Sequence, residues 1–133
     1  QILNLMQDLK AELGLSYLLI SHDLPVVRYM SDWIAVMYLG KIVEFAECED
    51  LFNSAKHPYT KALLSAIPIP DPTYKRERVQ RSIGEAHDVG SFSWLTHACH
   101  FYARCSYAMA KCRTAEPAQR EIGNEHYVAC HLC

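Results

Sequence analysis

The chain has 133 residues, of which 50% are hydrophobic and 21% charged, so its composition is that of a globular domain rather than a disordered segment. Thirteen Lys and Arg residues against fifteen Asp and Glu give a net charge of -2, which argues against a nucleic-acid partner. The longest apolar runs, residues 15–20 and 33–40, are too short to cross a bilayer.

The first predicted element is an amphipathic helix. Its apolar stripe consists of Ile2, Leu5, Leu9 and Leu13. Gly14 follows directly, and glycine readily takes the positive φ at which many helices end. Because the helical pattern has already begun at Gln1, we expect the chain to be a fragment of a longer protein.

A buried strand and a capped helix are predicted next. Residues 16–21 (SYLLIS) form an apolar run without alternation, which is typical of a strand buried on both faces. Asp23 can cap the following helix, and Pro25 fits its first turn. We expect this helix to contribute core residues at Val26, Val27 and Met30.

A β-hairpin and two short helices are predicted after this helix. Residues 33–46 (WIAVMYLGKIVEFA) indicate two strands joined by a tight turn around Gly40 and Lys41, at the edge of a sheet. Two helical patterns occupy residues 49–67, and Pro58 starts the second one. Its predicted apolar face consists of Leu63, Leu64 and Ile67. Prolines at positions 68, 70 and 72 then end regular structure.

The sequence as a whole predicts an α/β fold in three parts. Residues 1–70 carry the helices and strands, residues 71–98 form a connector of mixed composition, and residues 99–133 form a small irregular lobe rich in cysteine. Because this lobe mostly lacks hydrophobic periodicity, we expect a bound metal to supply much of its folding free energy.

His22 is the first candidate for a functional residue. It directly follows the predicted buried strand and precedes the capped helix. Ligands of open parallel sheets bind at the carboxyl ends of the strands, where a histidine can donate a hydrogen bond to a phosphate oxygen or orient a water. The alternative is a histidine that caps the helix or packs in the core.

The second candidate site consists of four cysteines, Cys99, Cys105, Cys112 and Cys130. Their spacing alone admits a metal, a disulfide framework or chance. The sequence shows no secretion-signal pattern, so we expect a reducing compartment, in which lasting disulfides are rare. Structural zinc sites favour paired C-x2–4-C hooks, and of these cysteines only Cys130 has such a partner, Cys133. Cys48 lies far away along the chain and is expected to be a free structural thiol.

Two blocks of sequence resemble a known family. Residues 1–44, from QILNLMQDLK through the triplet SHD to GKIVE, resemble the C-terminal part of ABC-transporter ATPase subunits. Residues 57–72 (HPYTKALLSAIPIPDP) resemble, more narrowly, the peptide and nickel importer branch of that family. The four-cysteine spacing is also similar to that branch, as are Arg104 before the second cysteine and HYVACH around the fourth.

This resemblance implies the C-terminal end of a P-loop-type nucleotide-binding domain, in a subunit that couples ATP hydrolysis to peptide uptake. His22 would be the switch-loop histidine, which contacts the γ-phosphate of ATP and helps to position the attacking water. Cys99, Cys105, Cys112 and Cys130 would hold a [4Fe–4S] cluster, with zinc as the alternative metal. The implied partners are a second ATPase subunit and transmembrane permease subunits, at the cytoplasmic face of the inner membrane.

The sequence contains no G-x-x-x-x-G-K-[ST] loop to cradle phosphates. In the family this loop lies upstream of the matched residues, so we expect ATP and Mg²⁺ to bind only together with that upstream half. The chain alone should therefore not hydrolyse ATP. Two other interpretations stay open: a stand-alone metal-binding or redox-sensing module without nucleotide activity, and an inactive truncated relic.

Overall fold

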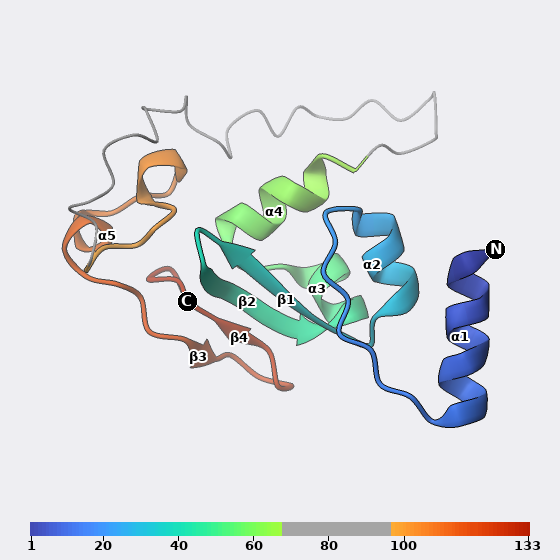
Figure 1. The fold of residues 1–133 in the computed structure, drawn as a ribbon. Helices are drawn as coiled ribbons and strands as arrows, with labels where there is room; N and C mark the ends of the chain where they lie inside the picture. The colour runs from blue at the N-terminus through green and yellow to red at the C-terminus, as the bar shows by residue number, and fades with distance from the viewer. Residues whose placement is uncertain (68–96) are drawn as a thin grey trace.

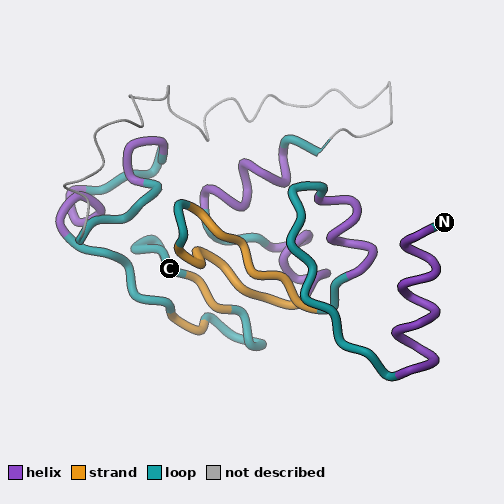
Figure 2. Tube along the Cα trace, viewed as in Figure 1, coloured by secondary structure: helices purple, strands orange, loops and turns teal. Residues whose placement is uncertain are grey.

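The computed structural model describes residues 1–67 and 97–133. In these ranges its helices are α1 (Ile2–Leu13), α2 (Leu24–Met30), α3 (Cys48–Ser54), α4 (Pro58–Ser65) and α5 (Ala110–Thr114). Its strands are β1 (Trp33–Tyr38), β2 (Lys41–Glu47), β3 (Arg120–Glu121) and β4 (Tyr127–Val128), and a 3-10 helix spans Tyr102–Arg104. Figures 1 and 2 show β3 and β4 lying beside the β1–β2 hairpin, with α1 set apart at the opposite end of the molecule.

The four strands form one antiparallel sheet in the order β1-β2-β4-β3. β1 and β2 pair up to Tyr38 and Lys41, so the predicted hairpin is confirmed. Its turn consists of Leu39 and Gly40, one residue earlier than predicted, and both have positive φ, at 45° and 78°. Two successive positive φ angles give the turn a twist that matches the twist of the paired strands. Among the described strands β1 forms one edge and β3 the other, whereas β2 lies inside the sheet.

The predicted strand at residues 16–21 is wrong. These residues form neither helix nor strand, and Leu18 and Ile20 are 93% and 90% exposed. A strand buried on both faces needs neighbouring strands to satisfy its backbone hydrogen bonds. Within residues 1–67 and 97–133 no strand pairs with this segment. Residues 16–21 therefore have the composition of a buried strand, but among the described residues they have no neighbouring strand to pair with.

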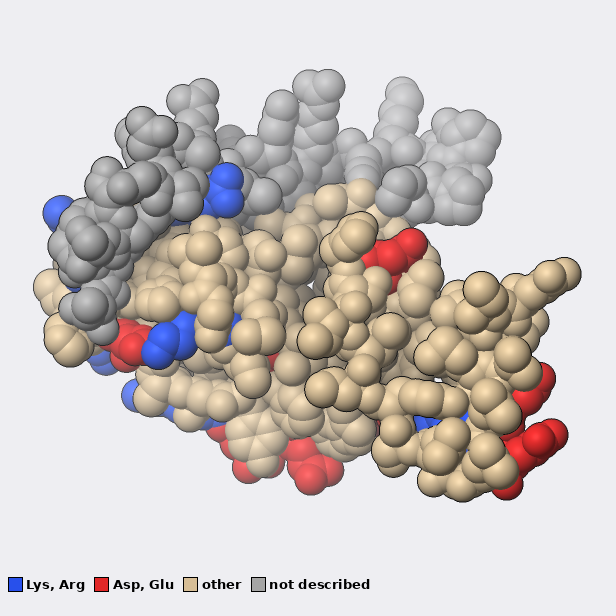
Figure 3. All heavy atoms as spheres, in the orientation of Figure 1, with Lys and Arg blue, Asp and Glu red and all other residues tan. Residues whose placement is uncertain are grey.

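Helix α1 is confirmed, but its apolar stripe is not buried. The helix ends at Gly14, whose φ of 64° is left-handed as predicted. Ile2 and Leu5 remain exposed, and contact with α2 is polar, through a hydrogen bond of 2.8 Å from the Gln7 side chain to the Tyr29 carbonyl. Figure 3 shows largely uncharged surface over α1, α2 and the segment between them. Within the described ranges, no helix has the length and apolar character that crossing a bilayer requires.

The core lies between the hairpin and the elements that pack on its inner face. Residues of β1 alternate between exposed and buried, as expected for a strand with one face in the core. Phe101, from the C-terminal part, meets the ring of Tyr38 edge-on at 5.1 Å. Of the residues predicted for α2, Met30 is buried and Val27 packs partly buried against the core. The buried cluster consists of Ile34, Val36, Tyr38, Val43, Ala46, Cys48, Leu51 and Phe101.

Helix α4 begins at Pro58 as predicted but turns a different face inward. Its buried residues are Pro58, Thr60 and Ala62, whereas the predicted Leu63 is only partly buried against the core. The backbone N–H of His57, just before the helix, donates to the buried carboxylate of Glu44 on β2 at 3.1 Å. This anchor fixes the first turn against the sheet and so sets the rotation of the helix.

The cysteine-rich part of the chain is built into the same sheet. β4 pairs with β2, with Val128 opposite Glu44. Next to this pair, the backbone N–H of Ala129 donates to the carbonyl of Val43 at 2.9 Å. The part that was predicted to be an irregular lobe thus contributes two short strands. The division into three parts stays a prediction, because most of the connector and the prolines that precede it lie outside the described residues.

Candidate functional site

His22 lies in the loop before α2 and is exposed. Its neighbour Asp23 caps α2 by accepting a hydrogen bond from the N–H of Val26 at 3.1 Å, which confirms the predicted cap. The backbone N–H of Asp23 in turn donates to the hydroxyl of Ser21 at 3.0 Å. These bonds hold the backbone on both sides of His22 and leave its imidazole in solvent. Its catalytic role stays a prediction.

The second candidate site lies in the C-terminal part, where the four predicted thiols approach one another. The backbone N–H of Cys99 donates to the carbonyl of Cys112 at 2.9 Å. Burial raises the pKa of the Cys99 thiol, and the negative charges of Cys112 and Cys105 raise it further. Burial also raises the pKa of Cys130 to about 11, with smaller contributions from Cys133, Cys99 and Cys105. Thiols that affect one another's ionisation in this way converge on one region.

Backbone amides meet all four of these sulfurs. The pairs are Cys99 with Phe101 and Tyr102, Cys105 with Tyr107, Cys112 with Met109, and Cys130 with Leu132. A hydrogen bond from an N–H to sulfur favours the thiolate, which is the form that binds metals. Cys48 differs, because its buried thiol donates to the carbonyl of Arg28 at 3.6 Å. The amide contacts therefore set the four predicted ligands apart from this structural thiol.

The four thiols are donors of the kind that bind zinc or iron, but the structure does not arrange them as a metal site. All six cysteines are free thiols. In a tetrahedral zinc site with Zn–S bonds of about 2.3 Å the sulfurs are about 3.8 Å apart. No three Cys, His, Asp or Glu side chains in residues 1–67 and 97–133 are placed to hold one metal ion.

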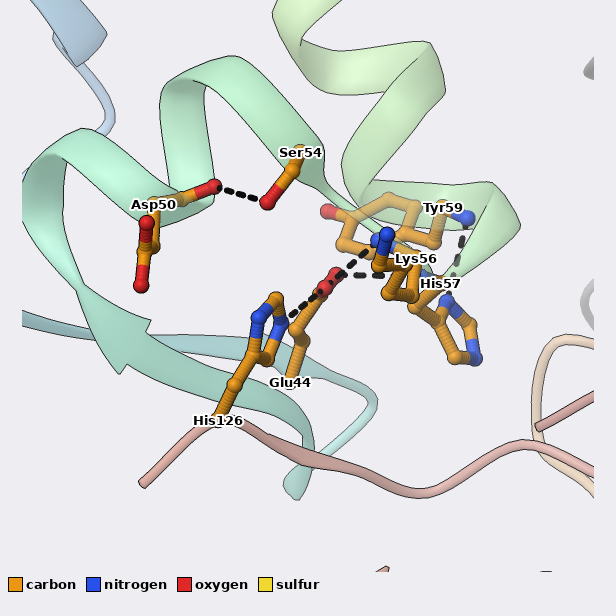
Figure 4. A network of polar contacts seen from close by, with 7 residues as sticks. All are labelled: Glu44, Asp50, Ser54, Lys56, His57, Tyr59 and His126. Carbon is orange, nitrogen blue, oxygen red and sulfur yellow. Dashed lines mark hydrogen bonds and ion pairs between the residues drawn. The ribbon is translucent and has the colours of Figure 1, made fainter. Parts of the chain in front are cut away.

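A buried polar network joins the hairpin to α4 and to the C-terminal part (Figure 4). Glu44 on β2 is fully buried. Its carboxylate accepts hydrogen bonds from the N–H of Lys56 at 2.6 Å and of His57 at 3.1 Å. The same carboxylate lies 2.8 Å from Nε2 of His126, which is 82 residues away along the chain. Three hydrogen bonds thus satisfy a charge that would otherwise be costly to bury.

No pattern in the amino-acid sequence indicates this network. Glu44 is a polar residue in an apolar strand, which is ordinary for a strand with one exposed face. His57 and His126 belong to the HPYT and HYVACH blocks of the family resemblance, which assign neither histidine a role. A local signal was present at His57, because a histidine directly before Pro58 is placed to cap the helix that the proline starts.

His57 is almost fully buried, and its ring is held by specific contacts. Its Nδ1 accepts a hydrogen bond from the backbone N–H of Tyr59 at 3.0 Å, which caps α4. Its ring lies 5.8 Å from the ring of Phe101. Burial lowers the pKa of His57 from 6.5 to about 4, and the charge of Glu44 opposes this shift only in part. The imidazole is therefore neutral at physiological pH.

This burial predicts a pH-dependent stability. Between pH 6.5 and pH 4 the unfolded chain binds a proton at His57 that the folded chain does not, so stability falls as the pH falls. Between pH 7 and pH 5 the free energy of unfolding should fall by about 2 kcal/mol more in the wild type than in His57→Asn, because asparagine does not titrate. Urea unfolding of the metal-free chain at both pH values measures it. Equal losses in the two proteins would contradict the prediction.

Comparisons with known proteins agree with the resemblance noted in the sequence. Residues 43–112 match the family model described as the C-terminal region of oligopeptide and dipeptide transporters. A Brucella ovis protein named for peptide import and ATP binding is 46% identical over 131 residues, which cover 98% of this chain and 40% of that protein. The oligopeptide transport ATP-binding protein AppF of Bacillus subtilis is 43% identical, with coverages of 99% and 40%.

The third relative is the oligopeptide transport ATP-binding protein OppF of Bacillus subtilis. It is 57% identical over 81 residues, which cover 61% of this chain and 27% of OppF. The chain thus spans about two fifths of the length of the first two curated relatives.

Proposed function

The chain belongs to the family of oligopeptide and dipeptide transporter C-terminal regions, and from this membership we propose that it forms the C-terminal part of the ATP-binding subunit of a peptide importer. The observation that carries the proposal is the match over residues 43–112, which runs from β2 through α4 to the third of the four cysteines. Two relatives, one named for peptide import and one for oligopeptide transport, align with 98% and 99% of the chain.

In the whole subunit, upstream residues would supply the phosphate-binding loop, and ATP with Mg²⁺ would bind there. Upstream residues would also cover the exposed Leu18 and Ile20. His22, directly after this segment, would contact the γ-phosphate and position the attacking water. The bonds that hold Ser21 and Asp23 support this role, because phosphoryl transfer depends on accurate positioning.

The partners follow from the same proposal. The subunit would associate with a second ATPase subunit and with transmembrane permease subunits, peripherally at the cytoplasmic face of the inner membrane. The net charge of -2 supports the expectation that nucleic acid is not among its partners.

A hybrid protein tests the proposed function. Residues 1–133 replace the matching part of Bacillus subtilis AppF, and the hybrid is expressed in a strain that lacks AppF. We expect ATP hydrolysis by the purified hybrid and restored uptake of a labelled oligopeptide, since the two sequences are 43% identical throughout. A hybrid whose phosphate-loop lysine is changed to alanine gives the background rate. A folded hybrid that neither hydrolyses ATP nor restores uptake would contradict the proposal.

We propose in addition that Cys99, Cys105, Cys112 and Cys130 hold a [4Fe–4S] cluster. The proposal is supported by the effect of the four thiols on one another's pKa and by the amides that meet each sulfur. When bound, such a cluster cross-links its four ligands and can accept one electron.

The cluster proposal predicts a composition and a ligand-dependence. Anaerobically purified chain should be brown and contain about four iron and four sulfide per molecule. Changing any one of the four ligand cysteines to serine should lower the iron content and loosen the C-terminal part, because metal binding and folding are coupled. Cys48→Ser is the matched control and should keep its iron. One zinc ion per chain without sulfide would show that the site binds zinc instead of a cluster. Disulfides between these cysteines in fresh lysates would show that the site binds no metal.

A further inference from the structure

A small hollow lies where the start of β2 meets the C-terminal part of the chain (Figure 1). Its volume is about 140 Å³. An engineered protein cavity of about 150 Å³ binds benzene, so this hollow has room for a ligand of about six heavy atoms. Pockets for drug-sized ligands measure about 300–1,000 Å³. The hollow therefore suits a small molecule and is too small for a nucleotide.

Much of the lining of this hollow is apolar. The apolar residues that line it are Ile42, Val43, Phe101, Pro117 and Ala129. Val43 and Phe101 also belong to the buried core of the protein, which holds this part of the lining in place. A ligand with a hydrocarbon body would gain free energy here, because the contact removes apolar surface from water.

The first polar group of the lining is the imidazole of His100. Its Nδ1 is buried and has no hydrogen-bond partner among the described residues. A buried polar atom needs a hydrogen bond to offset its loss of hydration. With its proton on Nδ1, the imidazole would donate a hydrogen bond to a ligand oxygen in the hollow.

The second polar group is the ammonium of Lys41, which lies 2.9 Å from a carboxylate oxygen of Glu116. Both side chains line the hollow. An ammonium has three N–H donors, so it can serve a second acceptor besides Glu116. The hydrogen bond from Lys41 lowers the pKa of Glu116, and the charges of Lys41, His100 and His97 lower it further. Basic side chains thus outnumber the one carboxylate here, which favours an anionic ligand over a cationic one.

We propose that the hollow binds a small aliphatic carboxylate. The ligand carboxylate accepts hydrogen bonds from Nδ1–H of His100 and from the ammonium of Lys41, which it shares with Glu116. Its hydrocarbon body lies against Val43 and Phe101. The inference goes beyond the proposed importer function, and it requires neither ATP nor a metal.

Three probes of nearly equal size test the class of ligand. Isobutyrate has the proposed chemistry, isobutyramide keeps its shape without the charge, and alanine carries an ammonium in place of one methyl group. Each is titrated into the ¹⁵N-labelled 133-residue chain, and NMR follows the backbone amides of Lys41, Val43, His100 and Phe101. We expect a Kd of about 1 mM for isobutyrate and about tenfold weaker binding of the other two probes.

Two substitutions test the proposed donors. His100→Leu removes the imidazole, and Lys41→Met removes the ammonium but keeps an aliphatic stem. Each should weaken isobutyrate binding about tenfold, because each removes one hydrogen bond to a charged group. Lys56→Met is the matched control, since Lys56 is exposed and is not among the residues that line the hollow. It should bind isobutyrate with the wild-type Kd.

Two results would overturn the ligand class or the site. Isobutyramide or alanine that binds as tightly as isobutyrate contradicts an aliphatic carboxylate as the ligand. Amides that do not shift with any probe, well above the expected Kd, show that the hollow is not a binding site.

A wild-type Kd in both His100→Leu and Lys41→Met contradicts the proposed donors. If His100→Leu does not fold, Lys41→Met decides, because the Lys41 side chain is 51% exposed and its replacement leaves the core intact. These results leave the importer proposal untouched, which the hybrid protein tests separately.

Discussion

His22→Ala in the AppF hybrid should lower ATP turnover by about 10²–10³-fold and leave nucleotide affinity nearly unchanged. A hydrogen bond aimed at the γ-phosphate and the attacking water strengthens as charge develops in the transition state, so its loss raises the barrier rather than weakening binding. Single-turnover hydrolysis measures the first quantity, and equilibrium titration with a labelled ATP analogue measures the second.

Ser21→Ala is the control for this substitution. It removes the hydroxyl that accepts the backbone N–H of Asp23, and so disturbs the same loop without removing the imidazole. Its effect on turnover should be much smaller than that of His22→Ala. If His22→Ala turns over ATP at the wild-type rate, His22 is not the γ-phosphate contact, and the interpretation as a loop or capping histidine takes its place.

Glu44→Ala should destabilise the 133-residue chain by about 3–5 kcal/mol, which is a large share of the stability of an ordinary domain. The substitution leaves two buried backbone N–H groups, of Lys56 and His57, and the imidazole of His126 without their common acceptor. Urea unfolding of metal-free chain, followed through Trp33 where it stacks on Phe45, measures the loss.

Glu47→Ala is the matched control, because Glu47 lies on the same strand with an exposed side chain. Its effect should stay within about 0.5 kcal/mol. Amide hydrogen exchange adds a local measurement, since loss of the Glu44 contact should speed exchange at Val128 and Ala129 of the C-terminal part. Equal effects of the two substitutions would show that the network around Glu44 contributes little.

The elements that sequence predicted correctly are those with local signals. Gly14 ends α1 and Asp23 caps α2 because the energetics of both positions depend on one residue and its immediate neighbours. The hairpin follows from alternation in β1 and a glycine at the turn. Residues 16–21 failed for the opposite reason. Burial on both faces is supplied by other strands, and composition alone cannot show whether those strands are present.

The candidate sites divide in the same way. The four cysteines were singled out by their resemblance to the importer branch, because their spacing alone admits a metal, a disulfide framework or chance, and their role as ligands stays a prediction. The contact between Glu44 and His126 was not predicted, because the two residues lie 82 positions apart and such a contact produces no periodic pattern in the sequence. The sequence also could not predict which face of α4 is buried. That face depends on the hydrogen bond between the backbone of His57 and Glu44 on β2.

The position of β2 inside the sheet has a consequence for the order of folding. One neighbour, β1, is joined to it by a two-residue turn and can pair within microseconds, whereas β4 comes from the far end of the described chain. Closing the loop of 82 residues between Glu44 and His126 costs about 4 kcal/mol of chain entropy. During synthesis the second edge of β2 therefore stays open until residues 126–129 have emerged. A chaperone or neighbouring chain that reaches this edge first would compete with β4 for the same backbone hydrogen bonds.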